Sequence, residues 1–325
     1  MTQFVKATSV AKTPSVNYNL AVSTARISRH FLSLIMLPLL MGGACGEKKS
    51  SKPTDTGAIT AADRADPATI NDSTPLAGVD ISKLEGDKQK LFYKLVNSLK
   101  SPCGKTHSLR TSFSSDTACK RAPFAVRYVI ALLEDEASED QAREEYTHKY
   151  ENPKTVKLDL SKAPRVGAED APVKIIEFFD YACPHCAQFK PMLDTVAQEQ
   201  AGKVAEYFLM FPLGKWPDSK SAAQAGLAAA KQNKFKEMHA VLFAKAPQHN
   251  KEAVMGYAKE LGLDLAKFEA DYAAAAAQVE NDRAQGEGAG VESTPTVYFN
   301  DRKYEGPLNP KYIGMWIEEE IAVNR

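Results

Sequence analysis

Short apolar runs in the C-terminal half of the chain predict the strands of a sheet. Residues 173–179 are almost entirely apolar, which favours a central strand that is buried on both faces. Residues 203–211 form a second run of this kind, residues 296–300 form a third, and a short return strand is expected around residues 303–305. Long helical patterns interrupt these runs, so the pattern predicts an α/β fold.

Apolar residues at helical spacing predict two groups of helices. The first group precedes the strands and covers residues 87–99, 123–134 and 138–150. Its third member begins with a capping-box pattern, in which Ser138 is followed by Gln141. The second group lies between the second and third strands, at residues 219–231, 234–245, 251–261 and 265–285. A closing helix is expected at residues 311–322.

The N-terminus has the charge and hydropathy pattern of a secretory signal. Residues 1–46 contain no Asp or Glu, and an apolar run at residues 31–41 ends shortly before Ala44 and Cys45. A basic region, an apolar run of about 7–15 residues and small residues at the cleavage site define such signals. Cys45 stands where a bacterial lipoprotein carries its lipidated cysteine. Ordinary cleavage after Ala44 and an organellar transit peptide are the alternatives.

Residues 46–84 are predicted to be a flexible linker. Ser, Thr, Pro, Asp and Ala predominate there, and residues 46–80 contain no aromatic side chain. Such a segment buries too little apolar surface to offset the entropy lost on ordering. The sequence therefore predicts a signal at residues 1–45, this linker, a small helical domain at residues 85–151 and an α/β domain at residues 155–325.

Charge and hydropathy exclude two classes of protein. Lys+Arg and Asp+Glu both number 41 in the 325 residues, whereas a general nucleic-acid-binding protein carries a basic surplus. No stretch of the sequence reaches the ~18 consecutive apolar residues of a membrane span, so a polytopic membrane protein is excluded. The length corresponds to roughly two domains.

Cys103 and Cys119 lie in or beside the loops of the small helical domain. In an oxidising compartment, a disulfide between them would join helices of a unit near the size limit for independent folding. A structural disulfide is the favoured interpretation. A second redox-active pair is the alternative, although a gap of 15 residues is unlike the short spacing of redox dithiols.

The motif Cys183-Pro184-His185-Cys186 follows the predicted central strand and opens a helical pattern. A strand, a CxxC motif and a helix in this order indicate a thioredoxin-like redox site. Unpaired N–H groups and the helix dipole favour an anion at a helix N-terminus, so we expect the thiol of Cys183 to have a lowered pKa. Cys186 is the expected resolving cysteine. Pro184 suits the first turn, and His185 adds a donor or a positive charge that favours the reduced form.

Neighbouring residues argue against other uses of this motif. Attachment of c-type haem requires a histidine directly after the second cysteine, where Ala187 stands. A structural zinc site needs two further ligands at short spacing, and the sequence has no second CxxC and no HxxxH. No metal is therefore predicted, and an inert structural disulfide is the remaining alternative.

Residues 155–325 resemble the DsbA-type thioredoxin-fold oxidoreductases of the bacterial cell envelope, through IIEFFDYACPHCAQFKP and GVESTPTVYFNDRKYEG. The resemblance implies a thioredoxin fold with a helical insertion. It implies a cis peptide bond at Thr294-Pro295, which faces the dithiol and presents its backbone to a client chain. In this family a carboxylate beneath the dithiol accepts the proton of the resolving cysteine, and Glu177 is a better candidate than Asp180. An ordinary proline at the start of a strand and a Glu177 side chain turned toward solvent are the alternatives.

The same resemblance implies a function on the periplasmic side of the cell envelope. The expected partners are client proteins with cysteine thiols and a membrane redox partner that regenerates the dithiol/disulfide. No diffusible cofactor and no nucleic acid are expected, and contact with the membrane is expected only through a lipid on Cys45. Oxidation of client thiols is the favoured direction. Thr294 departs from the best-known oxidants, however, and occurs in isomerase and reductase branches.

A shorter resemblance concerns PFAVRYVIALLEDEASEDQAREEYTHKYENP, which is similar to the helical hairpin of cytochrome c maturation thiol proteins but lacks their CxxC. It keeps a reductase or isomerase that serves cytochrome c maturation as an alternative function. A non-catalytic client-binding or chaperone module is the alternative from a different class.

Overall fold

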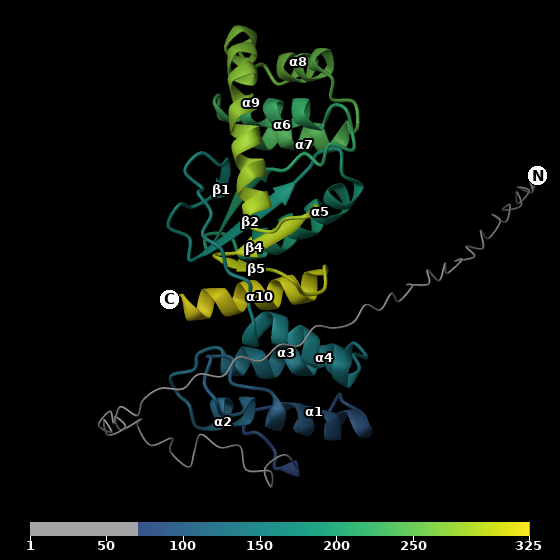
Figure 1. The fold of residues 1–325 in the computed structure, drawn as a ribbon, viewed down its shortest axis with the longest axis vertical. Helices are drawn as coiled ribbons and strands as arrows, with labels where there is room; N and C mark the ends of the chain where they lie inside the picture. Colours follow the sequence, from purple (N-terminus) through teal and green to yellow (C-terminus); the bar gives the residue numbers. More distant parts are fainter. Residues whose placement is uncertain (1–70, 325) are drawn as a thin grey trace, which may run out of the picture. The chain divides into compact units, whose positions relative to one another are not determined.

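The computed structural model describes residues 71–324, which form a helical unit at residues 71–151 and a sheet domain at residues 155–324 (Figure 1). The helical unit contains α1 (Asp87–Ser98), α2 (Leu109–Ser114), α3 (Ala122–Glu134), α4 (Glu139–Tyr146) and a π-helical turn, Thr147–Glu151. Ser138 and Gln141 form both hydrogen bonds of the predicted capping box at the start of α4. Only α2 was not predicted, because its six residues are too few for a periodic pattern.

The prediction of a flexible linker is wrong for residues 71–84, which pack as part of the helical unit. Leu76 and Leu84 are 5% and 1% exposed and belong to its apolar core. The side chain of Arg110 also donates a hydrogen bond to the backbone carbonyl of Asp72. Single leucines in a polar segment make no periodic pattern, so the composition concealed this packing. The rest of the predicted linker, the signal and Cys45 lie outside the described residues.

Five strands form the sheet, in the order β1-β3-β2-β4-β5. Their bounds are β1 (Arg165–Gly167), β2 (Val173–Phe179), β3 (Val204–Met210), β4 (Thr296–Phe299) and β5 (Arg302–Lys303). Only β2 and β3 are parallel, and the other neighbours are antiparallel. All residues of β2 except Lys174 are buried, as its apolar sequence predicts for a central strand. The three residues of β1 carry too little pattern to be predicted.

Helices cover the sheet from several sides (Figure 1). α5 (Pro184–Glu199) and α10 (Pro310–Val323) share an apolar core with one face of β2, β3 and β4. The insertion between β3 and β4 consists of α6 (Ser219–Ala230), α7 (Phe235–Ala244), α8 (Lys251–Glu260) and α9 (Leu265–Gly288). This insertion packs on the ends of β2 and β3 near the dithiol, through Phe179, Phe208 and Met210. Such an insertion is what the resemblance implied.

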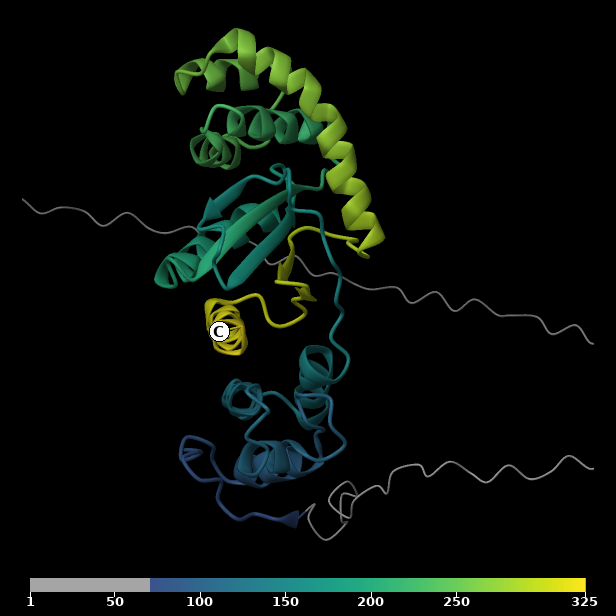
Figure 2. The ribbon, with the colours of Figure 1, turned by 90° about the vertical axis from the view of Figure 1, so that its left-hand side faces the viewer.

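The longest helix, α9, links the insertion to the opposite face of the sheet. Figure 2 shows it running from the other insertion helices down beside the strands. Near its end, a Cβ atom at Gly286 would lie only 2.6 Å from the ring of Phe211, so the close approach requires glycine. The segment at residues 156–163, which enters the domain, packs on the same face of the sheet.

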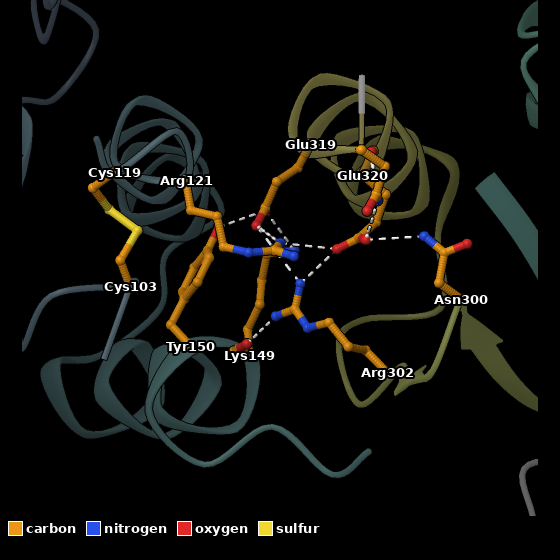
Figure 3. Close-up of polar contacts among 10 residues, drawn as sticks. Cys103, Cys119, Arg121, Lys149, Tyr150, Asn300, Arg302, Glu319 and Glu320 are labelled. Atoms are coloured by element: carbon orange, nitrogen blue, oxygen red, sulfur yellow. Dashed lines mark hydrogen bonds and ion pairs between the residues drawn. A yellow bond between two sulfur atoms is a disulfide. The ribbon is translucent and has the colours of Figure 1, made fainter. Parts of the chain in front are cut away.

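A buried network of charges joins the helical unit to the sheet domain (Figure 3). The helical unit contributes Arg121 and Lys149, which reach Glu319 and Glu320 on α10. The sheet domain adds Arg302, whose guanidinium lies 2.7 Å from the carboxylate of Glu320. Burial alone would raise the pKa of Glu320, but the two arginines outweigh it and lower the pKa to about 2. The helical unit is therefore held by ion pairs as well as by apolar contact.

Cys103 and Cys119 form a disulfide. The bridge closes the loop that contains α2 and ends two residues before Arg121, so it holds the segment that leads into the charge network. Closing a loop of this length stabilises a fold by about 3 kcal/mol in the chain-entropy model. Within residues 71–324, none of the helices has the length and apolar character needed to span a membrane.

We expect Glu319→Gln to destabilise the protein far more than Glu318→Gln. Glu319 is 1% exposed and faces three cations, so its loss leaves buried positive charges uncompensated, at a cost of about 3 kcal/mol or more. Among the described residues Glu318 pairs only with exposed Arg127, and its loss should cost less than about 1 kcal/mol. Urea unfolding measures both variants. Equal free energies of unfolding would contradict a structural role for the network.

Candidate functional site

The dithiol lies where the central strand meets a helix, because only a short loop separates β2 from α5. Cys183 is the N-cap of α5, and Pro184 is its first residue. The backbone N–H of Cys183 donates to the carbonyl of Asp180 at 3.0 Å, and the N–H of Ala187 donates to the carbonyl of Cys183 at 3.1 Å. The side chains of Pro184 and His185 are exposed. The structure therefore brings all four motif residues to the helix N-terminus, as the sequence predicts.

Both cysteines of the motif are free thiols and both are buried, with exposed fractions of 3% for Cys183 and zero for Cys186. Burial raises the pKa of the Cys186 thiol well above its usual range, and the nearby carboxyl of Glu177 raises it further. The backbone of Asp180 and the hydroxyl of Thr294 act weakly in the opposite direction. Cys186 therefore holds its proton tightly, and thiolate chemistry at this sulfur requires a proton acceptor and donor close by.

Thr294 and Pro295 lie opposite the dithiol, although more than a hundred residues separate them from it in the sequence. The Sγ atom of Cys183 is 3.5 Å from the carbonyl oxygen of Thr294, and the Thr294–Pro295 peptide bond is cis. Antiparallel pairing of β4 with β2, with Thr296 opposite Phe178, brings this loop beside the end of β2. The backbone of Thr294 is thus in position to contact whatever is bound to Cys183.

Glu177 lies beneath the dithiol with its carboxyl buried, so the alternative in which it faces solvent is wrong. Its side chain is 1% exposed, and neither oxygen has a hydrogen-bond partner among residues 71–324. Burial raises the pKa of Glu177 to about 8, against the opposing effect of the Lys190 ammonium. Near neutral pH this carboxyl can therefore both give and accept a proton, which is the property required of a partner for Cys186.

Two further charged residues near the site were missed by sequence reasoning. Lys190 on α5 and Glu206 on β3 line a cavity of about 650 Å³ together with His239 on α7. Burial raises the pKa of Glu206, and one of its oxygens has no hydrogen-bond partner in the described part of the chain. A glutamate inside the apolar run of residues 203–211 was the available signal, since a charge in a buried strand requires an explanation. Within residues 71–324, no group of three or more His, Cys, Asp or Glu side chains is placed to hold a metal ion.

A comparison with protein families matches residues 160–319 to the family described as Thioredoxin. The sheet domain has a thioredoxin fold with a helical insertion. The match covers the dithiol, the helical insertion, the Thr294-Pro295 loop and most of α10. It does not cover the helical unit, which precedes the thioredoxin domain in the sequence.

Solved structures of similar proteins cover about half of this chain. Oxidised BdbD from Bacillus subtilis is 26% identical, covers 52% of this chain and 98% of its own, and gives a TM-score of 0.47. The catalytic domain of ScsC from Proteus mirabilis is 26% identical, with coverages of 50% and 91% and a TM-score of 0.44. The thiol-disulfide exchange protein α-DsbA2 from Wolbachia pipientis is 23% identical, with coverages of 50% and 88% and a TM-score of 0.45.

Curated relatives of the chain are longer proteins that carry the name of Na⁺/H⁺ antiporters. The Na⁺/H⁺ antiporter NhaA 3 of Salinispora tropica is 32% identical over 162 residues, which are 49% of this chain and 25% of the antiporter. NhaA 1 of Mycobacterium sp. strain KMS is 33% identical over 146 residues, with coverages of 43% and 24%. The chain thus spans about a quarter of the length of these relatives.

We expect Glu177→Gln to change how stability depends on pH. In the folded protein the pKa of Glu177 is raised from 4.5 to about 8. Between these two pH values the folded state therefore holds a proton that the unfolded chain has released. Its contribution to stability is therefore complete below pH about 4.5 and is lost as pH rises through about 8, on the order of 5 kcal/mol. The variant lacks this loss and should be more stable than the wild type at pH 9.

Urea unfolding at several pH values measures this difference. Glu199→Gln, which changes an exposed glutamate at the other end of α5, is the matched control and should follow the wild type. Identical pH profiles for the wild type and Glu177→Gln would show that the carboxyl of Glu177 is not held in its neutral form.

Proposed function

We propose that this protein is a thiol–disulfide oxidoreductase that oxidises cysteine thiols of client proteins. The observation that carries the proposal is the position of Cys183, with its sulfur 3.5 Å from the Thr294 carbonyl and Cys186 one helical turn further on. One sulfur faces the loop that could hold a client backbone, and the other is buried near Glu177. A purely structural pair of cysteines requires neither feature.

The first step begins from the oxidised form, in which a disulfide joins Cys183 and Cys186. A client thiolate attacks the Sγ atom of Cys183, and the bond between Cys183 and Cys186 breaks. The client sulfur is then bound to Cys183 as a mixed disulfide, and the electron pair of the broken bond leaves on Cys186. The backbone of Thr294 would hold the client chain in extended form during this exchange.

The proton of Glu177 completes this step. The raised pKa of Cys186 makes its thiolate a strong base, and the neutral carboxyl of Glu177 is the adjacent acid that can protonate it. A second client thiolate then attacks the client sulfur of the mixed disulfide and releases Cys183 as a thiolate. The client loses two electrons and gains a disulfide, and the protein gains the two electrons as a dithiol.

Regeneration requires an oxidant that accepts two electrons, and we infer a membrane redox partner for this role. The proton of Cys186 then returns to Glu177 as the disulfide forms again. The disulfide between Cys103 and Cys119 supports an oxidising compartment, since such bonds persist outside the reducing cytosol. Together with the signal-like N-terminus and Cys45, this supports a location on the periplasmic side of a bacterial envelope, with a lipid on Cys45 as the attachment to the membrane.

The direction of electron flow is tested by the reduction potential of the purified dithiol in glutathione buffers. An oxidant needs a stabilised reduced form, and we expect a potential well above that of thioredoxin, which is about −270 mV. A potential close to that of thioredoxin would contradict the role as oxidant and would indicate a reductase or isomerase. The residue before the proline, Thr294, keeps this alternative open.

The roles of the two cysteines are tested by trapping. In Cys186→Ala the thiolate of Cys183 can still attack a client disulfide, and the second client sulfur leaves as a thiolate. The resulting mixed disulfide has no Cys186 to attack it, so client adducts should accumulate and be visible on non-reducing gels. Cys183→Ser is the control and should form none. A non-catalytic binding module would instead bind unfolded clients equally well in both variants, and an absence of adducts in Cys186→Ala would contradict the assigned roles.

A further inference from the structure

Asp180 connects the dithiol loop to a second segment of the thioredoxin domain. Its side chain is 2% exposed, and its Oδ1 atom accepts a hydrogen bond from the backbone N–H of Ala182 at 2.9 Å. Its Oδ2 atom accepts from the backbone N–H of Leu213 at 2.9 Å and from the hydroxyl of Ser219 at 3.0 Å. One donor belongs to the dithiol loop, and the other two lie at the ends of the segment that joins β3 to α6, here called segment 213–219.

A carboxylate is the group that this position requires. All three donors point at Asp180, and a carboxylate has two oxygens that only accept. An asparagine would keep one acceptor and place an NH₂ group against donors. No ion pair of Asp180 occurs among the described residues, so these three bonds stabilise a buried carboxylate that is otherwise costly. The position thus couples the dithiol loop to segment 213–219.

Segment 213–219 exposes side chains that suit contact with a peptide. Lys215 is exposed and forms no ion pair within residues 71–324. Trp216 is half-buried and packs against the apolar cluster that also contains Cys183 and Tyr181. A large aromatic ring that is only partly covered is typical of binding surfaces, and an ammonium group without an ion pair is available to a carboxylate.

We propose that segment 213–219 is part of the surface that binds the client chain, and that Asp180 is the positioning residue that holds it beside the dithiol. This inference rests on the proposed function and names the client chemistry it favours. Trp216 favours an aromatic side chain, and Lys215 favours a carboxylate, close to the client cysteine that attacks Cys183. The Thr294 backbone and segment 213–219 then hold different parts of the same client.

The test compares two kinds of thiol substrate for the oxidised full-length protein. Dithiothreitol has no chain to bind and reports on the dithiol alone. Two peptides with a pair of cysteines report on client binding, one with Phe and Glu beside the first cysteine and one with Ala and Gln. The variant Lys215→Ala/Trp216→Ala should raise the KM for the Phe/Glu peptide by about fivefold or more. Its rate with dithiothreitol and its KM for the Ala/Gln peptide should stay within about twofold of the wild type.

Asp180→Asn and Ser219→Ala test the positioning role. Ser219→Ala removes one of the three hydrogen bonds of Asp180 and leaves the bond to the dithiol loop in place. This variant therefore tests the positioning role even if Asp180→Asn does not fold. Both should raise the KM for the Phe/Glu peptide while the dithiothreitol rate of Ser219→Ala is retained. Adding Ser219→Ala to Lys215→Ala/Trp216→Ala should change KM no further, because the contact it positions is already gone.

Lys90→Ala/Tyr93→Ala, which changes a lysine and a half-buried tyrosine of α1, is the matched control and should behave as the wild type. An unchanged KM of Lys215→Ala/Trp216→Ala for the Phe/Glu peptide would overturn the binding surface. Fully additive effects of Ser219→Ala would overturn the positioning role. Wild-type protein that oxidises neither dithiothreitol nor the peptides would instead refute the proposed function itself, so the two failures are distinguishable.

Discussion

Burial of Cys186 beside Glu177 is the constraint on which the rest of the site depends. A thiol and a carboxyl that share an apolar environment both resist ionisation, so the pKa of each is raised. In the proposed reaction, one proton passes between them when the disulfide opens or closes. Pro184 and His185 of the motif are exposed. The pKa values of Cys186 and Glu177 beneath them are set mainly by burial.

The pairing of the strands positions the groups of the site relative to one another. β2 ends at the dithiol loop and carries Glu177 two residues before its end, and its pairing with β4 brings Thr294 beside Cys183. Its parallel neighbour β3 leads into segment 213–219, which the carboxylate of Asp180 holds against the same loop. The dithiol loop, the Thr294 loop and segment 213–219 therefore all depend on the register of one central strand.

The helical unit is held far more firmly than a flexible attachment would require. Arg121 and Lys149 reach two carboxylates of α10, and the disulfide of Cys119 holds the segment that precedes Arg121. Buried ion pairs cost desolvation energy and are strongly destabilising when half removed, so such a network favours one specific orientation of two parts. The network therefore accounts for how the helical unit is attached to the thioredoxin domain.

The sequence by itself determined the central strand, the dithiol motif, the insertion helices and the pair Cys103–Cys119, because apolar runs, helical spacing and cysteine positions are local signals. It also marked Glu177, whose charge stands out in an apolar strand. Only the tertiary structure decided that residues 71–84 belong to the helical unit, that Glu206 shares a cavity with Lys190, and that Asp180 bonds Leu213 and Ser219. These features arise from segments that are distant along the chain, and a side chain's partners across such distances leave no periodic pattern in the sequence.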